Sequence, residues 1–283
     1  MKRKYNFNQE FFSNLDTPEK AYVLGLLYSD GCVSDNKGKY IIFGQSEDNK
    51  DIVYKVNKIL NSDYPIHKIL KGSKYFYYIN LYSDKMFSDL EKLGIEPHKS
   101  LTVKFPEIPN DLLSHFIRGL FDGDGCVWNG KRKEMIVKDS KSPTGTRKRI
   151  VHNVKFTYTG NFDFVNRLQD IIVDKLGFKK TKLNFSKAKS TKHICTMEYS
   201  GRGQLKKFYE FIYKNSTIHG NTKKSKFEEI FCALEEKSSK DTSLIAGTPE
   251  MAISSQALIE EGSTTIPEMG VDSSESKCEA PNE

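Results

Sequence analysis

The segment YVLGLLYSDGCV, residues 22–33, is an apolar run that ends in an acid and a glycine. Alone, it predicts a helix that ends in a glycine turn, because glycine is the commonest residue just past a helix end. An acid in the last turn is unfavourable, because the C-terminal end of the helix dipole carries partial negative charge. Asp30 therefore needs an explanation from outside this segment.

A second copy of the segment provides one. FIRGLFDGDGCV, residues 116–127, is identical to residues 22–33 at six of twelve positions. A further pair follows in the same order, NKDIVYKVNKIL at 49–60 and NFDFVNRLQDII at 161–172. Two matched elements in the same order indicate a duplicated domain.

Each half reads as helix, two strands, helix, two strands and helix, so the fold class predicted is α+β with two αββαββα halves. In the first half we expect helices at 18–29, 50–60 and 84–93, and strands at 32–34, 40–45, 66–70 and 75–82. In the second half we expect helices at 110–123, 162–176, 203–213 and 223–235, and strands at 126–129, 151–159, 181–186 and 193–199. Because the strands alternate apolar and polar residues, helices are expected to cover one face of each antiparallel sheet and leave the other open.

The two copies also predict how the halves meet. Gly25 and Ser29 share one face of the first helix, and Gly119 and Gly123 share one face of the second. If these small residues pack on each other, Asp30 and Asp124 come to lie side by side. Two like charges at helix C-termini need cations, and Mg²⁺ binds through one or two carboxylates plus phosphate oxygens and water.

Charge divides the chain into a basic body and an acidic tail. Residues 238–283 hold two lysines, nine acids and no aromatic residue, so their net charge is −7 and we expect them to form a disordered tail. The whole chain carries +7, so residues 1–237 carry +14, which favours a polyanionic partner. The five cysteines form no C-x-x-C pair, and no signal peptide or membrane span is evident. We expect a soluble protein in a reducing, intracellular setting, the cytoplasm or an organellar matrix.

The pair VLGLLYSDG, residues 23–31, and IRGLFDGDG, residues 117–125, resembles the two signature motifs of the LAGLIDADG homing endonucleases in their single-chain form. The resemblance implies half-domains at 1–106 and 107–237, packed through the motif helices, with the sheets forming a DNA-binding saddle. It implies a monomeric, intron-encoded endonuclease that cuts both strands of a long asymmetric DNA target with Mg²⁺ or Mn²⁺. The last acid of each motif, Asp30 and Asp124, would bind the metal. The sixth motif position differs between the copies, as Tyr28 and Asp122, but it is not the ligand position in the family.

The same resemblance implies a basic residue late in each half. The matching segments give Lys99 in the first half and Lys223 in the second, with Lys224 as the rival. Each would stabilise charge on the scissile phosphate or polarise water. Gln45 stands where the family places a polar residue that positions water.

DNA contacts are expected from the strands, and above all from the basic segment 131–150, which lengthens the first hairpin of the second half. The candidate DNA-binding residues are Lys39, Gln45, Lys131, Arg132, Lys133, Arg147, Lys155, Lys182 and Lys192, with Thr157 as a further base reader.

Two alternatives from other functional classes stay open. Members of this family also act as RNA maturases that assist splicing of their own group I introns, and a basic aromatic surface does not separate RNA from DNA. A non-catalytic DNA-binding regulator on the same fold would be expected to have lost the motif acids, and both are present here.

Overall fold

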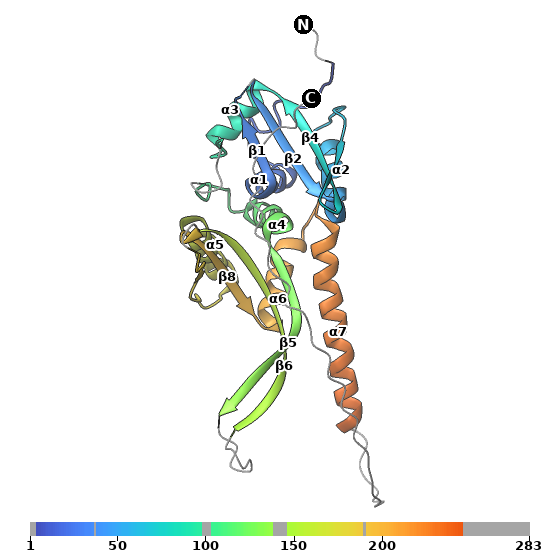
Figure 1. Ribbon diagram of the computed structural model, residues 1–283, viewed down its shortest axis with the longest axis vertical. Coiled ribbons are helices and arrows are strands. Elements are labelled where there is room, and N and C mark those ends of the chain that lie inside the picture. The colour runs from blue at the N-terminus through green and yellow to red at the C-terminus, as the bar shows by residue number, and fades with distance from the viewer. Residues whose placement is uncertain (1–3, 37, 98–102, 138–145, 189–190, 246–283) are drawn as a thin grey trace, which may run out of the picture. The chain divides into compact units, whose positions relative to one another are not determined.

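The computed structural model describes residues 4–36, 38–97, 103–137, 146–188 and 191–245, and for 131–137, 146–152 and 236–245 it describes the backbone (Figure 1). The chain divides into two compact units, residues 1–232 and 233–283, and the fold below is that of the first. In the described part of the chain, no helix combines the length and the apolar character needed to cross a membrane. Lys99 lies outside the described residues.

The first half has the predicted order of elements. They are α1 (Pro18–Asp30), β1 (Gly31–Ser34), β2 (Tyr40–Ser46), the 3-10 turn η1 (Glu47–Asn49), α2 (Lys50–Ile59), β3 (His67–Lys71), β4 (Lys74–Tyr82) and α3 (Asp84–Lys92). Helix α1 begins after Thr17, whose hydroxyl accepts a hydrogen bond from the Lys20 amide, and Pro18 occupies its first turn. The expected boundaries are right to within one or two residues.

The second half repeats this order. Its elements are α4 (Leu113–Asp124), β5 (Cys126–Val137), β6 (Thr146–Asn161), α5 (Phe162–Leu176), β7 (Asn184–Phe185), β8 (Ile194–Ser200), α6 (Arg202–Tyr213) and α7 (Asn221–Ile245). Helix α5 spans the predicted residues: the Asn161 side chain caps its start, and Gly177 ends it in the left-handed conformation with φ of 64°.

Several boundaries in the second half differ from the prediction, among them the start of α4, which lies at Leu113 and not at 110. Strands β5 and β6 extend far beyond 126–129 and 151–159, so the first hairpin is longer than that of the first half, as the basic segment predicted. Strand β7 is shorter than 181–186. Helix α7 continues past the predicted end at 235 to Ile245, so the expected disordered tail begins too early at 238, and its part from 246 onward lies outside the described residues.

The strand orders show the duplication directly. The described residues form two antiparallel sheets, with orders β1-β2-β4-β3 and β5-β6-β8-β7. In matching registers, Cys32 pairs with Ile42 in the first sheet and Cys126 pairs with Thr157 in the second. The two halves therefore have the same topology, which confirms the predicted fold class.

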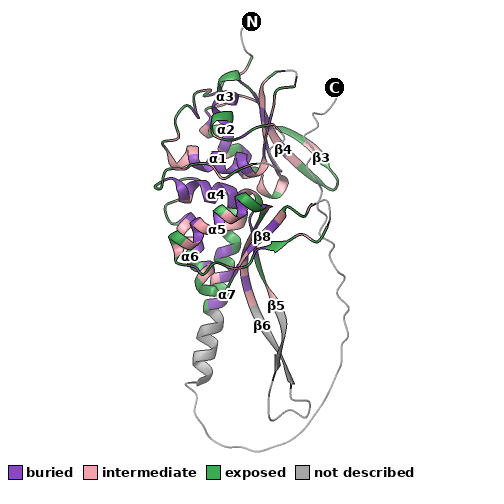
Figure 2. Ribbon diagram, turned by 90° about the vertical axis from the view of Figure 1, so that its left-hand side faces the viewer, coloured by how far each residue is buried: buried purple, intermediate pink, exposed green. Residues whose placement is uncertain are grey.

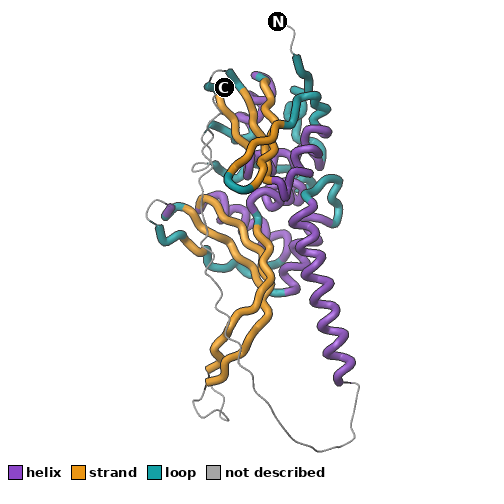
Figure 3. Tube along the Cα trace, turned by 45° about the vertical axis from the view of Figure 1, so that its right-hand side comes forward, coloured by secondary structure: helices purple, strands orange, loops and turns teal. Residues whose placement is uncertain are grey.

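Helices cover one face of each sheet. In the unit of residues 1–232 they gather on one side of the strands (Figure 3), and the buried residues concentrate in α1, α4 and the strand positions that face them (Figure 2). Burial alternates along β4 and β8, so every second side chain points into the helical layer. The other face of each sheet stays open, as predicted.

Candidate active site

The two motif helices touch backbone to backbone. A Cβ added to Gly25 would lie 2.9 Å from the Leu120 amide nitrogen and closer still to the Phe116 carbonyl oxygen. A Cβ on Gly119 would lie 2.9 Å from the Leu26 amide nitrogen. Glycine is therefore required at both positions, and the contact expected between these two glycines is present in the structure.

The second pair of small residues, Ser29 and Gly123, lies beside the two motif acids. Helix α1 ends at Asp30 and α4 ends at Asp124, and each is followed at once by a strand. A Cβ on Gly123 would overlap Ser29 and lie 2.5 Å from Oδ2 of Asp30, so the end of α1 lies directly against the end of α4. Asp30 is half-exposed and Asp124 is exposed. The structure thus brings both motif acids to one accessible place where the two halves meet.

The charges of both acids affect the pKa of Tyr158 in β6. It is buried, with 5% of its surface exposed. Its pKa is raised well above the ordinary value, first by burial and then by the negative charges of Asp124 and Asp30. Tyr158 therefore stays a neutral phenol beside the acids. The sequence does not mark it, because it is one of two aromatic residues, with Phe156, in the predicted strand 151–159.

Gln45 takes a different position from the one expected of a base reader. It is 6% exposed and lies on the helix-covered side of β2. Its Nε2 donates a hydrogen bond to Oδ2 of Asp30 at 2.7 Å. Gln45 therefore orients a motif acid, and burial removes it from the candidate base-contacting set.

Lys223 lies at the end of α4. Its ammonium donates to the carbonyl oxygens of Phe121 at 2.8 Å, Asp122 at 2.9 Å and Gly123. Burial lowers the pKa of Lys223, while the charges of Asp122, Asp30 and Asp124 act in the opposite direction. A cation at a helix C-terminus complements the helix dipole.

The rival lysine makes a different contact. Lys224 lies 3.7 Å from Glu228 in an ion pair one turn along α7. Of the two lysines left open by the sequence, Lys223 is the one that the structure places at the acids.

The candidate DNA-binding residues fall into three groups. Lys155 and Thr157 lie on the open side of β6, where Lys155 pairs with Glu198 at 2.7 Å and lies over the Trp128 ring. Lys182 and Lys192 are exposed just before β7 and β8. The remaining strand residues lie in the long hairpin: Lys131, Arg132 and Lys133 in β5, and Arg147 in β6.

Lys39 departs from this pattern. Its Nζ lies 4.8 Å from the centre of the Phe87 ring of α3, on the helix-covered side of the first sheet. Lys39 is therefore not placed to read bases from the open face. Aromatic residues stand there instead: Tyr40 lies beside Tyr82, and His67 stacks on Tyr78 with ring centres 5.1 Å apart.

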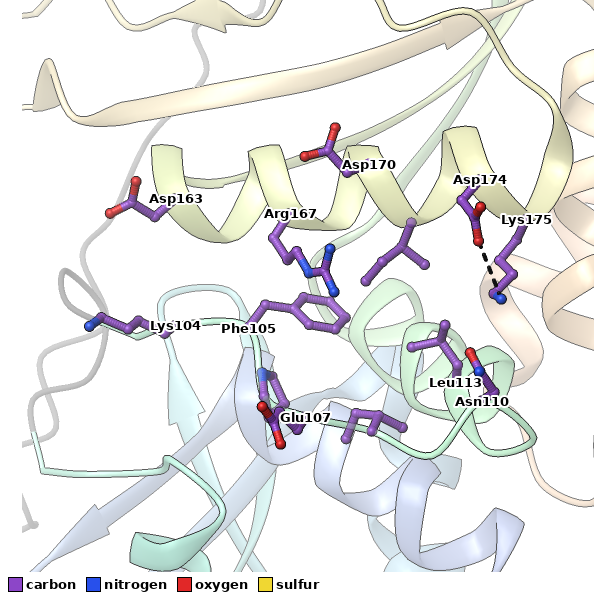
Figure 4. A pocket seen from close by; sticks show the side chains of 13 residues that line it. Lys104, Phe105, Glu107, Asn110, Leu113, Asp163, Arg167, Asp170, Asp174 and Lys175 are labelled. Atoms are coloured by element: carbon purple, nitrogen blue, oxygen red, sulfur yellow. Dashed lines mark ion pairs between the residues drawn. The ribbon is translucent and has the colours of Figure 1, made fainter.

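A cavity of about 870 Å³ lies elsewhere, between the segment 104–113 and α5 (Figure 4). Arg167 reaches toward the Phe105 ring, and Asp174 pairs with Lys175 at 3.3 Å. Its lining contains none of the residues singled out from the sequence. The motif acids therefore lie outside this cavity.

Known structures resemble this arrangement. The I-LtrWI LAGLIDADG homing endonuclease bound to target DNA matches with a TM-score of 0.52 and 13% identity, over 83% of this chain and 93% of that one. The LAGLIDADG meganuclease I-AabMI bound to uncleaved DNA matches with a TM-score of 0.50 and 15% identity, over 80% and 93%. This chain has the LAGLIDADG homing endonuclease fold. The meganuclease I-SmaMI bound to uncleaveable DNA matches with a TM-score of 0.51 and 11% identity, over 79% and 93%.

Comparison by sequence finds no match, although comparison by structure does. No protein-family model matches the chain, and no curated protein matches it in sequence. The LAGLIDADG fold confirms the resemblance that the two motifs predicted.

Proposed function

We propose that this protein is a site-specific endonuclease that hydrolyses both strands of double-stranded DNA with a divalent metal. The observation that carries the proposal is the meeting of Asp30 and Asp124 at the ends of two touching motif helices, beside Lys223 and between two open sheet faces. The similar structures named above hold DNA, which supports DNA as the substrate class here.

The residues at the helix ends fit a hard divalent cation. Two carboxylates at helix C-termini, each against the helix dipole, favour a bound positive charge. Among the described residues, no group of three or more His, Cys, Asp and Glu side chains is placed to hold a metal ion. Mg²⁺ and Mn²⁺ suit this donor set, because Mg²⁺ takes one or two carboxylates and leaves its other positions to phosphate oxygens and water. When bound, such an ion supplies a hydrolytic water of lowered pKa and stabilises the leaving oxygen.

The other residues of the site orient the motif acids and balance their negative charge. Gln45 holds Asp30 through the hydrogen bond of 2.7 Å. In its protonated form, Lys223 places a positive charge beside the acids, where it can stabilise the charge that develops on a scissile phosphate. By the duplication we assign the corresponding role in the first half to Lys99.

DNA binding is assigned to the open sheet faces and the long β5–β6 hairpin. The hairpin carries Lys131, Arg132, Lys133 and Arg147, and basic residues of this kind hold the phosphate backbone without reading sequence. Lys155, Lys182 and Lys192 extend the basic surface across the second sheet. We propose a single chain with half-domains 1–106 and 107–237, intron-encoded and acting as a monomer on a long asymmetric target in the cytoplasm or an organellar matrix.

One observation favours a second candidate function. The open face of the first sheet carries the ring pairs Tyr40–Tyr82 and His67–Tyr78. Flat aromatic side chains on a sheet can stack on unpaired bases, which is how many proteins bind single-stranded RNA. Intron RNA is therefore the partner to test for a maturase activity.

The decisive experiment measures metal-dependent cutting. A plasmid that carries the uninterrupted host gene, or a plasmid library with randomised inserts, is incubated with the protein in Mg²⁺, Mn²⁺ or EDTA. We expect linear product only with metal, and none from Asp30→Asn or Asp124→Asn. The matched control is Asp16→Asn, which removes an exposed carboxylate paired with Lys20 and should cut normally. Cutting in EDTA would overturn the metal requirement, and tight DNA binding without cutting in any metal would favour the regulator.

A further inference from the structure

The sixth position of the second motif is a buried carboxylate. Asp122 is 2% exposed. Its Oδ2 accepts hydrogen bonds from the Tyr22 hydroxyl at 2.8 Å and the Gly220 amide at 2.6 Å, and its Oδ1 accepts one from the Tyr213 hydroxyl at 2.5 Å. A buried carboxylate is costly unless it is fully hydrogen-bonded, so this one is kept in place by partners from three segments.

One of these partners, Gly220, lies three residues before Lys223 in the chain. Gly220 immediately precedes α7, and Lys223 stands in the first turn of that helix. The backbone carbonyl of Asp122 accepts from Lys223 at 2.9 Å, while its side chain accepts from Gly220. Residues 220–223 are therefore attached to the end of α4 at two points, one at each end of the segment.

The first half holds the same segment from the other side. Lys55 of α2 donates to the His219 carbonyl at 2.8 Å and to Oδ1 of Asn221 at 2.9 Å. Thr222 donates to the Asp48 carbonyl at 2.8 Å. These contacts attach residues 219–222 to the first half, and the hydrogen bond from Gly220 attaches them to Asp122 near the end of α4.

A different residue makes the corresponding link in the first half. Tyr28 occupies the sixth motif position, and its hydroxyl donates to the Leu93 carbonyl at 2.5 Å, just after α3. Tyr213, a partner of Asp122, likewise ends α6, the corresponding helix of the second half. In both halves the sixth motif residue thus ties the motif helix to the end of the last helix before the lysine-bearing segment.

We propose that Asp122 is a positioning residue that holds Lys223 at the motif acids, and that Tyr28 makes the corresponding tie in the first half. The catalytic consequence rests on the proposed function, but the positioning itself does not. Because the two ties differ chemically, each can be weakened without touching the other.

The first test needs neither DNA nor metal. Reductive methylation of the full chain, followed by peptide mass spectrometry, measures how accessible each lysine ammonium is. In Asp122→Leu, Lys223 should be methylated about tenfold faster than in the wild type, because the segment has lost the hydrogen bond from the Gly220 amide to the Asp122 side chain. Asp122→Asn keeps an acceptor for Gly220 and should restore the slow rate. Lys20, whose side chain is 18% exposed in its pair with Asp16, should stay slow in every folded variant.

The possible results separate positioning from unfolding. If Lys20 and Lys223 both become reactive in Asp122→Leu, the milder Tyr213→Phe decides: it removes one hydrogen bond and should accelerate Lys223 alone. Equal Lys223 rates in the wild type, Asp122→Leu and Tyr213→Phe would overturn the proposal. This outcome is independent of whether the protein cuts DNA.

The second test follows the two strands separately. With a linear target duplex that carries a different label on each strand, Asp122→Leu should cut one strand more slowly than the other, because only one strand depends on Lys223. Tyr28→Phe should slow the opposite strand, and DNA binding measured in Ca²⁺ should be unchanged in both. Equal slowing of both strands by each variant would overturn the strand-specific role. If the wild type does not cut at all, the proposed function fails while the methylation result stands.

Discussion

Gly25 of α1 and Gly119 of α4 lie face to face, and a Cβ on either one would stand 3.0 Å from the Cα of the other. The neighbouring atoms are backbone and cannot move aside like the end of a side chain. This contact sets the separation of the motif helices and thereby the separation of the acids at their ends.

Replacing Gly119 with alanine should therefore destabilise the protein by about 3 kcal/mol, because the added methyl forces the helices apart. Chemical denaturation monitored by circular dichroism measures the change. The control is Gly203→Ala in α6, where an added Cβ meets nothing within 4 Å. That variant should be neutral or stabilising by up to about 1 kcal/mol, because alanine favours helix. Similar losses from both changes would contradict the backbone contact.

Gln45→Leu should impair cutting without impairing DNA binding. Leucine fills a similar volume but leaves Oδ2 of Asp30 without the donor at 2.7 Å. Cutting rates should fall about tenfold, the cost of one hydrogen bond to a charged group, while affinity for the target in Ca²⁺ stays the same. An affinity loss matching the rate loss would instead return Gln45 to the set of DNA-contacting residues.

Lys155→Met should lower the salt dependence of DNA binding. Lys155 lies on the open face of the second sheet, and each phosphate contact contributes about one to the slope of log affinity against log salt concentration. Lys39→Met is the matched control, because Lys39 packs over Phe87 on the covered side. Affinities at several salt concentrations give the slopes. Equal slopes for the wild type and Lys155→Met would rule out a phosphate contact at Lys155.

His115 should make the protein less stable in mild acid. It is 7% exposed, its Nδ1 has no hydrogen-bond partner among the described residues, and burial followed by the charge of Arg118 lowers its pKa. Below the ordinary value of 6.5, the unfolded chain binds a proton that the folded protein resists, so this contribution weakens folding as pH falls through 6.5 toward the lowered pKa.

The check compares unfolding free energies at pH 7.5 and pH 5.5. His115→Asn should lose less stability between these values than the wild type does. The exposed His193 serves as control, and His193→Asn should follow the wild type. If the wild type, His115→Asn and His193→Asn all lost the same stability between pH 7.5 and pH 5.5, a group other than His115 would cause the loss.

Local patterns in the sequence predicted most of the elements. Helix α5 has the predicted residues because Asn161 and Gly177 mark its ends chemically. The end of α7 was placed too early because charge and composition change near 238 while the helix continues to Ile245. Composition alone was therefore a poor guide to that end.

The phase of a strand was harder to predict than its existence. A shift of one residue moves a side chain from the open to the covered face. Gln45 and Lys39 were expected to face DNA, but both lie on the helix-covered side of the sheet. Tyr158 and Asp122 were not expected in the site at all, because burial beside the acids is a property of packing between distant segments.

The sequence by itself determined the duplication, the motif helices and the two acids, because these depend on residues close together in the chain and on a repeat visible without a structure. Only the tertiary structure decided that Lys223 and not Lys224 lies at the acids, that Gln45 holds Asp30, and that Asp122 holds Gly220. These contacts join residues 15 to 102 positions apart. Such distances are set by how helices and sheets pack, which no local pattern encodes.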